Sequence, residues 1–127
     1  MANESLYLVK LQFKSDNVGA GSMVLQLAVN PATGTLNGGA EGHILEGTQH
    51  SPSFTARASG HLHSTGYGGV TKVGAVTGQA VVSFSAPAIG SFEAPFTASF
   101  GVDNSWEGEG TFTVGEHTYP CKVSLLD

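Results

Sequence analysis

Hydrophobic and polar residues alternate along most of this chain. The clearest stretch is residues 91–100, where Phe92, Ala94, Phe96, Ala98 and Phe100 alternate with serine, threonine, glutamate and proline. A period of two places one set of side chains on a buried face of a strand and the other set in water. The alternation recurs about eight times, and no segment keeps the spacing of an amphipathic helix for long enough to form one. The pattern therefore predicts an all-β fold.

The alternating segments also give the order of the expected strands. These strands cover residues 6–14, 23–30, 35–45, 53–63, 71–85, 91–100, 106–114 and 117–125. Residues 64–69 are expected to form a loop, and Asn30 to Gly34 a type I turn closed by a left-handed glycine. Because short turns join consecutive strands, we expect an antiparallel barrel or sandwich of about eight strands with meander connections.

The last hairpin can be predicted to the residue. A two-residue turn with glycine first fits Gly115-Glu116. That turn sets the cross-strand partners Phe112 with Tyr119, Gly110 with Cys121, Gly108 with Val123, Trp106 with Leu125 and, on the other face, Glu109 with Lys122. In this register the position of the missing Pro120 N–H points away from the 106–114 strand, toward whatever strand lies on the other side. We therefore expect the last strand to be an edge or to contain a bulge.

Small residues on the inward series indicate how the interior is filled. Glycine and alanine let strands approach closely, as in a small barrel. Between them, bulk comes from the seven phenylalanines Phe13, Phe54, Phe84, Phe92, Phe96, Phe100 and Phe112. We therefore expect a packed interior.

Length, charge and cysteine content narrow the class of protein. The 127 residues fit one domain over 1–127. A net charge of -5 with scattered Lys and Arg argues against nucleic acid and anionic membrane as partners. Cys121, the one cysteine, excludes an intrachain disulfide. The start lacks a basic segment followed by an apolar one, so we expect a cytoplasmic protein, or one exported without a classical signal peptide.

Two histidines are the sharpest local chemical feature. His61 and His63 share one strand face, which is how a strand can present two imidazoles to a metal ion. A third ligand would have to come from His43, His50, His117 or Glu41, none of which has a diagnostic spacing. The other interpretation is a solvated strand face, which the histidines share with Arg57 and Ser59.

Two aromatic residues are candidates for ligand binding. Tyr67 lies among glycines in the expected 64–69 loop, and Trp106 opens the expected 106–114 strand. Aromatic side chains at a barrel mouth, beside short polar groups, suit a sugar or another small ligand. The alternative is that Tyr67 is an ordinary loop residue and that Trp106 plugs one end of the core.

No catalytic arrangement stands out. Glu107 and Glu109 share a face, but it is the one opposite the apolar stripe, and Cys121 is expected to be buried and inert. We therefore expect a non-enzymatic binding or protein-interaction module without a cofactor. Its partner would be a protein, a small molecule or a second copy that pairs through an edge strand. The alternatives are a calyx for a sugar or apolar ligand, and a metal-dependent enzyme that uses His61 and His63.

Three strand-and-turn segments resemble a known family. They are residues 6–10 (LYLVK), 25–30 (LQLAVN) and 34–38 (GTLNG). Together they are similar to small bacterial proteins that contain domain of unknown function 1842. The resemblance implies a bacterial, single-domain β protein, and the family carries no catalytic or binding residues that could be transferred to this chain.

Overall fold

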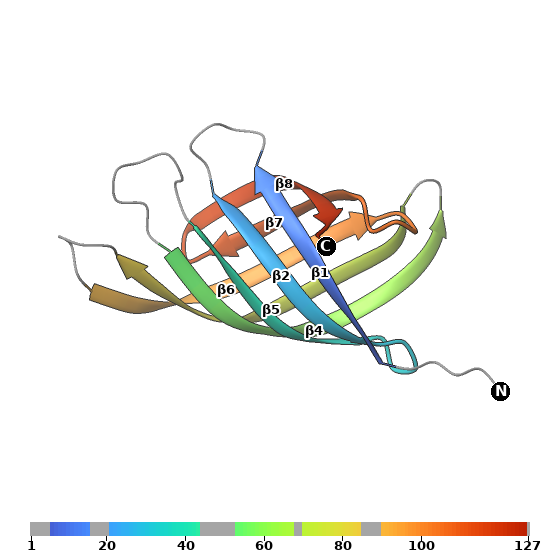
Figure 1. The fold of residues 1–127 in the computed structure, drawn as a ribbon, viewed down its shortest axis with the longest axis horizontal. Coiled ribbons are helices and arrows are strands. Elements are labelled where there is room, and N and C mark those ends of the chain that lie inside the picture. Colours follow the sequence, from blue (N-terminus) through green and yellow to red (C-terminus); the bar gives the residue numbers. More distant parts are fainter. Residues whose placement is uncertain (1–5, 16–20, 44–52, 68–69, 85–89, 127) are drawn as a thin grey trace.

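The computed structural model describes residues 6–15, 21–43, 53–67, 70–84 and 90–126. They form the eight strands β1 (Tyr7–Ser15), β2 (Ser22–Asn30), β3 (Thr35–His43), β4 (Ser53–Tyr67), β5 (Val70–Phe84), β6 (Gly90–Val102), β7 (Gly108–Val114) and β8 (His117–Leu125). Each strand pairs antiparallel with the next one along the chain, and β8 pairs with β1 to close a barrel (Figure 1). The all-β meander predicted from the alternation is confirmed, and of the two predicted architectures the structure is the barrel.

The β7–β8 hairpin has the register that its turn predicts. Val114 lies opposite His117, and Gly115 has a φ of 62°, which places the first turn residue in the left-handed region that glycine tolerates. The predicted partners of Gly108, Glu109, Gly110 and Phe112 are all present. The predicted pair of Trp106 with Leu125 is wrong, because β7 begins only at Gly108.

Pro120 marks the end of a ladder. The expectation that the last strand is an edge or contains a bulge is wrong for its described pairing. Residues Leu125 to Cys121 pair without a register shift with Leu11 to Ser15 of β1. The described β1–β8 register ends at Cys121, the residue after Pro120. The missing N–H therefore falls where the ladder stops, and it removes no hydrogen bond from the described pairing.

Aromatic rings fill the barrel. Phe13, Phe54, Phe96 and Phe112 are at most 1% exposed. The ring centroid of Phe54 lies 6.0 Å from that of Phe96 and 5.9 Å from that of Phe112, and Phe13 meets Phe112 edge-on at 6.3 Å. The packed interior is confirmed for these rings, whereas the side chain of Phe84 lies outside the described residues. Among the described residues, the buried side chains belong to hydrophobic and aromatic residues, and none of them is charged.

Glycine allows neighbouring strands to come unusually close at two central positions. A Cβ at Gly38 would overlap the carbonyl oxygen of Gln26 on β2, and one at Gly78 would overlap that of Arg57 on β4. In both cases the obstacle is backbone, which cannot rotate away as a side chain can. Glycine kinks of this kind let a sheet curve into a closed barrel.

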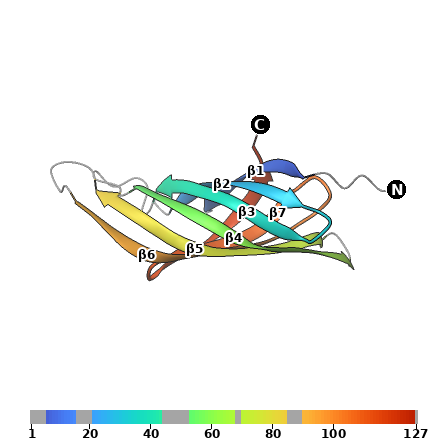
Figure 2. The ribbon, with the colours of Figure 1, turned by 90° about the horizontal axis from the view of Figure 1, so that it is seen from below.

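The middle strands are longer than their neighbours. β4, β5 and β6 have 15, 15 and 13 residues, whereas the other strands have 7 to 9. The paired ends of β5 and β6 therefore project past the rest of the barrel, as Figures 1 and 2 show.

The described residues contain no helix that is long and apolar enough to cross a membrane.

Adjacent glycines on β3 provide a test of the kinks. We expect Gly38→Ala to lower the free energy of unfolding by about 2–3 kcal/mol, because the backbone of β2 must move. Gly39→Ala is the matched control: its Cβ would lie 3.1 Å from the carbonyl oxygen of Ala56, a tight contact without overlap. Urea unfolding measures both variants, and equal losses would show that the close approach at Gly38 does not constrain the barrel.

Candidate functional site

Asp103 organises the turn that joins β6 to β7. Its carboxylate accepts hydrogen bonds from the backbone N–H groups of Ser105 and Glu107 at 2.8 and 3.1 Å. The N–H of Trp106 donates to the carbonyl oxygen of Asp103 at 3.0 Å. Trp106 has a φ of 62°, a left-handed conformation that costs a bulky residue about 1–2 kcal/mol. A turn this well bonded can hold the strained residue in place.

The ring of Trp106 plugs this end of the barrel. Only 9% of the residue is exposed. Its ring meets that of Tyr7 edge-on at 6.4 Å, packs against Phe100 at 6.3 Å, and lies 5.0 Å from the Lys72 ammonium, a cation–π contact. Trp106 therefore lies in a turn before β7 rather than at the start of a strand, and its ring fills the end that a ligand calyx would need open.

Tyr67 belongs to a strand rather than to a loop. The expected loop at 64–69 is wrong for residues 64–67, which extend β4, with a register shift between Ser64 and Tyr67. Tyr67 pairs with Val70, the first residue of β5. Its backbone lies at the same end of the barrel as Trp106, because the start of β5 also bonds the β6–β7 turn through the Thr71 hydroxyl and the Asn104 side-chain oxygen at 3.0 Å. The side chain of Tyr67 lies outside the described residues.

The two histidines of β4 share the outer wall, as the alternation predicts. Their ring centroids are 6.5 Å apart and the planes differ by 19°. His61 lies opposite Thr35 and Ala75, and His63 opposite Val73, so their cross-strand neighbours offer no third metal-binding side chain. Nowhere in the described part of the chain do three or more His, Cys, Asp or Glu side chains gather in a way that could hold a metal ion. His50 lies outside the described residues.

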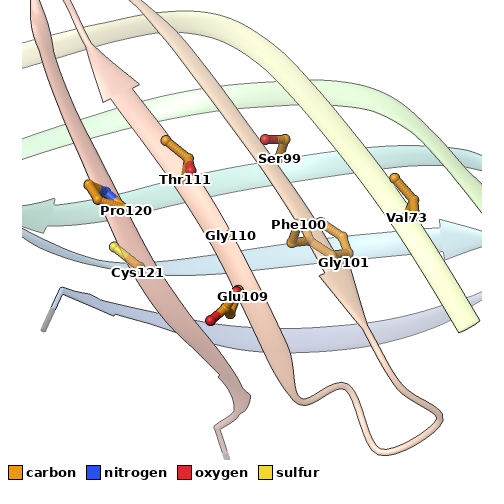
Figure 3. Close-up of a pocket in the computed structure, with 9 residues that line it drawn as sticks. All are labelled: Val73, Ser99, Phe100, Gly101, Glu109, Gly110, Thr111, Pro120 and Cys121. Carbon is orange, nitrogen blue, oxygen red and sulfur yellow. The ribbon is translucent and has the colours of Figure 1, made fainter. Parts of the chain in front are cut away.

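Several grooves mark the outer wall, and two of them differ in charge. One, of about 430 Å³, crosses β5 to β8 (Figure 3). Its lining residues are Val73, Ser99, Phe100, Gly101, Glu109, Gly110, Thr111, Pro120 and Cys121, with a single carboxylate. The other, of about 410 Å³, lies over β3 to β5 and is lined by Asn37, Gly38, Arg57, Ala58, Ser59, Thr77, Gly78 and Gln79, with a single cation. Sequence alternation could not reveal either groove, because each depends on the register of several strands.

One segment of β6 has a described partner on one side only. β7 pairs with β6 from Phe96 onward, and the Gly115 N–H adds one bond to the Pro95 carbonyl oxygen at 2.9 Å. Residues 90–94 of β6 pair with β5, and no other described strand reaches them. Phe92 was expected in the core but is 49% exposed. Its side chain does face the inner side of the sheet. At this position, however, β5 and β6 extend beyond the described end of β7, so the opposite wall of the barrel does not cover the ring.

Tyr7 gives the plugged end a pH signature. Burial raises the pKa of the Tyr7 phenol above its ordinary value of 10.0. Because the folded-state pKa is raised, this group's contribution to stability is present below pH 10 and is lost as the pH rises through the folded value. We expect the difference between wild-type and Tyr7→Phe ultraviolet titrations to show a phenolate forming above pH 10 in the folded protein and near pH 10 in urea. The same midpoint in both conditions would show that partial burial does not perturb the Tyr7 phenol.

Comparison with known proteins identifies the family of this chain. A family model described as a domain of unknown function (DUF1842) matches residues 4–119. No curated protein and no solved structure matches the chain. Because the family model covers most of the chain, the protein belongs to this family, DUF1842.

Proposed function

We propose that this protein is a non-enzymatic interaction module that associates with a second copy of itself through residues 90–94 of β6. The observation that supports the proposal is the run of three exposed residues, Ser91, Phe92 and Glu93, on a strand segment that has a described partner on one side only. A strand edge that no other described strand covers can act as a template for another strand, and a half-exposed aromatic residue beside it adds apolar surface.

The hydrogen bonds of β6 show which of its backbone N–H and C=O groups point toward the side where β7 ends. The carbonyl oxygen of Pro95 points toward β7, where it accepts a bond from Gly115. The backbone groups of alternate residues point to the same side of a strand, so Ser91 and Glu93 direct their N–H and C=O groups past the end of β7. Pro95 has no N–H to offer, so a new ladder would extend from Glu93 away from the barrel.

Two copies related by a two-fold axis can pair these segments antiparallel, so that the backbone groups of one copy bond the same groups of the other. With Phe92 opposite Phe92 of the second copy, Ser91 faces Glu93 twice, and each such pair exchanges two N–H···O bonds. A serine hydroxyl then lies across from each carboxylate, and no two like charges face each other. The two phenylalanines occupy a non-hydrogen-bonded pair, where side chains are closest.

The short edge implies weak association. Four backbone hydrogen bonds contribute roughly 2–6 kcal/mol in total, and covering two half-exposed phenylalanines roughly 2–3 kcal/mol. Losing the translational and rotational freedom of one copy costs at least about 4 kcal/mol. The net free energy is therefore at most about 5 kcal/mol, which corresponds to a dissociation constant of about 0.2 mM or weaker, so association would depend strongly on concentration.

A proline substitution tests this edge selectively. We expect Glu93→Pro to abolish self-association while the β5–β6 pairing survives, because the N–H it removes points away from β5. Phe92→Ser should weaken self-association severalfold by removing the exposed ring. Val81→Ser is the matched control, since it removes an apolar side chain that is 42% exposed on the same hairpin but points to the outer wall.

Sedimentation equilibrium near millimolar concentration measures the association, and circular dichroism verifies that each variant is folded. A wild-type chain that stays monomeric under these conditions would overturn the proposal. So would a folded Glu93→Pro variant that associates as strongly as the wild type.

A further inference from the structure

We infer that the groove over β3 to β5 binds a small sugar acid, a carboxylate whose neighbouring carbons carry hydroxyl groups. This site is separate from the β6 edge and does not depend on self-association. The inference starts from Arg57, which is the one cation that lines this groove, and from the neutral polar groups that surround it.

Arg57 has open space beside it on the outer wall. It lies on β4, opposite Gly39 on β3, which has no side chain, and opposite Gln79 on β5. No acidic residue lines the groove, and within the described part of the chain Arg57 forms no ion pair with a carboxylate. The exposed guanidinium is therefore available to an anion from solution.

The chemistry of the guanidinium favours a carboxylate. Arginine presents two parallel N–H groups, which match the two oxygens of a carboxylate. Phosphate-rich ligands such as nucleic acids are usually held by several clustered cations, whereas this groove has one. In a chain of net charge -5, a single cation framed by neutral groups attracts an anion only locally, so affinity must also come from the neighbouring side chains.

Those neighbours suit hydroxyl groups. Asn37, Ser59 and Thr77 lie in one cross-strand row, and Gln79 lies beside Arg57 in the next. Amide and hydroxyl side chains both donate and accept hydrogen bonds, as sugar hydroxyls do. Gly38 and Gly78 have no side chain and the methyl group of Ala58 is buried in the core, so these residues line the groove with backbone and a ring can approach the sheet closely. A groove of about 410 Å³ is at the small end of ligand sites and suits one or two sugar rings.

The experiment compares D-glucuronate with D-glucose, which differ in the carboxylate. Backbone amide shifts in two-dimensional NMR spectra report where each sugar binds. We expect glucuronate to shift the amides of residues 37–39, 57–59 and 77–79 with a dissociation constant of roughly 1–10 mM, as suits an exposed charge pair. Glucose should bind about tenfold more weakly.

Three charge variants separate the site from the net charge of the chain. We expect Arg57→Gln to weaken glucuronate binding about tenfold and to leave glucose binding nearly unchanged. Lys122→Gln removes the same charge from an exposed position outside the groove, and it should change neither sugar's affinity. Asn37→Asp keeps the shape of the rim but adds a negative charge, so it should weaken glucuronate binding while glucose still binds.

Three results would overturn the inference. They are equal shifts with the two sugars, equal effects of Arg57→Gln and Lys122→Gln, or shifts that fall outside the three groove segments. The Glu93→Pro variant keeps this test independent of self-association, because the groove is lined by β3 to β5 and should bind glucuronate in the monomer.

Discussion

The barrel depends on a steric constraint: its inner face must hold large rings while its strands approach closely enough to bend. Glycine reconciles the two demands. At Gly38 and Gly78 the carbonyl oxygen of a neighbouring strand occupies the space of a missing Cβ. At Gly74 the ring of Phe100, its cross-strand partner, does the same. The glycines therefore provide both the curvature of the wall and room for the rings that fill it.

The unequal lengths of the strands decide which surfaces remain open. A barrel of equal strands would leave only turns at its ends, but here β5 and β6 continue past β7. The β6–β7 pairing helps to close the barrel from Phe96 onward. It leaves residues 90–94 of β6 with β5 as their one described partner strand. The candidate interaction edge is thus a consequence of how the barrel closes, and so is the exposure of Phe92.

Charge is sparse, so single charged residues define local chemistry. Lys72 is engaged with the Trp106 ring at the plugged end, and Glu109 is the carboxylate of one outer groove. Arg57 is the cation of the groove over β3 to β5. Because the interior is filled with apolar side chains, the described surfaces that could hold a polar ligand lie on the outer wall, where glycines and small residues leave hollows between strands.

The sequence by itself determined which face each strand residue takes, because side chains alternate with a period of two regardless of the partner strand. It also determined the β7–β8 register, because Gly115 restricts the turn and the turn aligns everything that follows. Only the tertiary structure decided that the sheet closes into a barrel and that Pro120 lies next to the end of the described β1–β8 pairing rather than on an edge strand. It also decided that the ring of Trp106 points into the barrel from a backbone with a positive φ. Alternation describes a strand and its two faces, whereas closure, strand ends and grooves depend on where the neighbouring strands begin and stop.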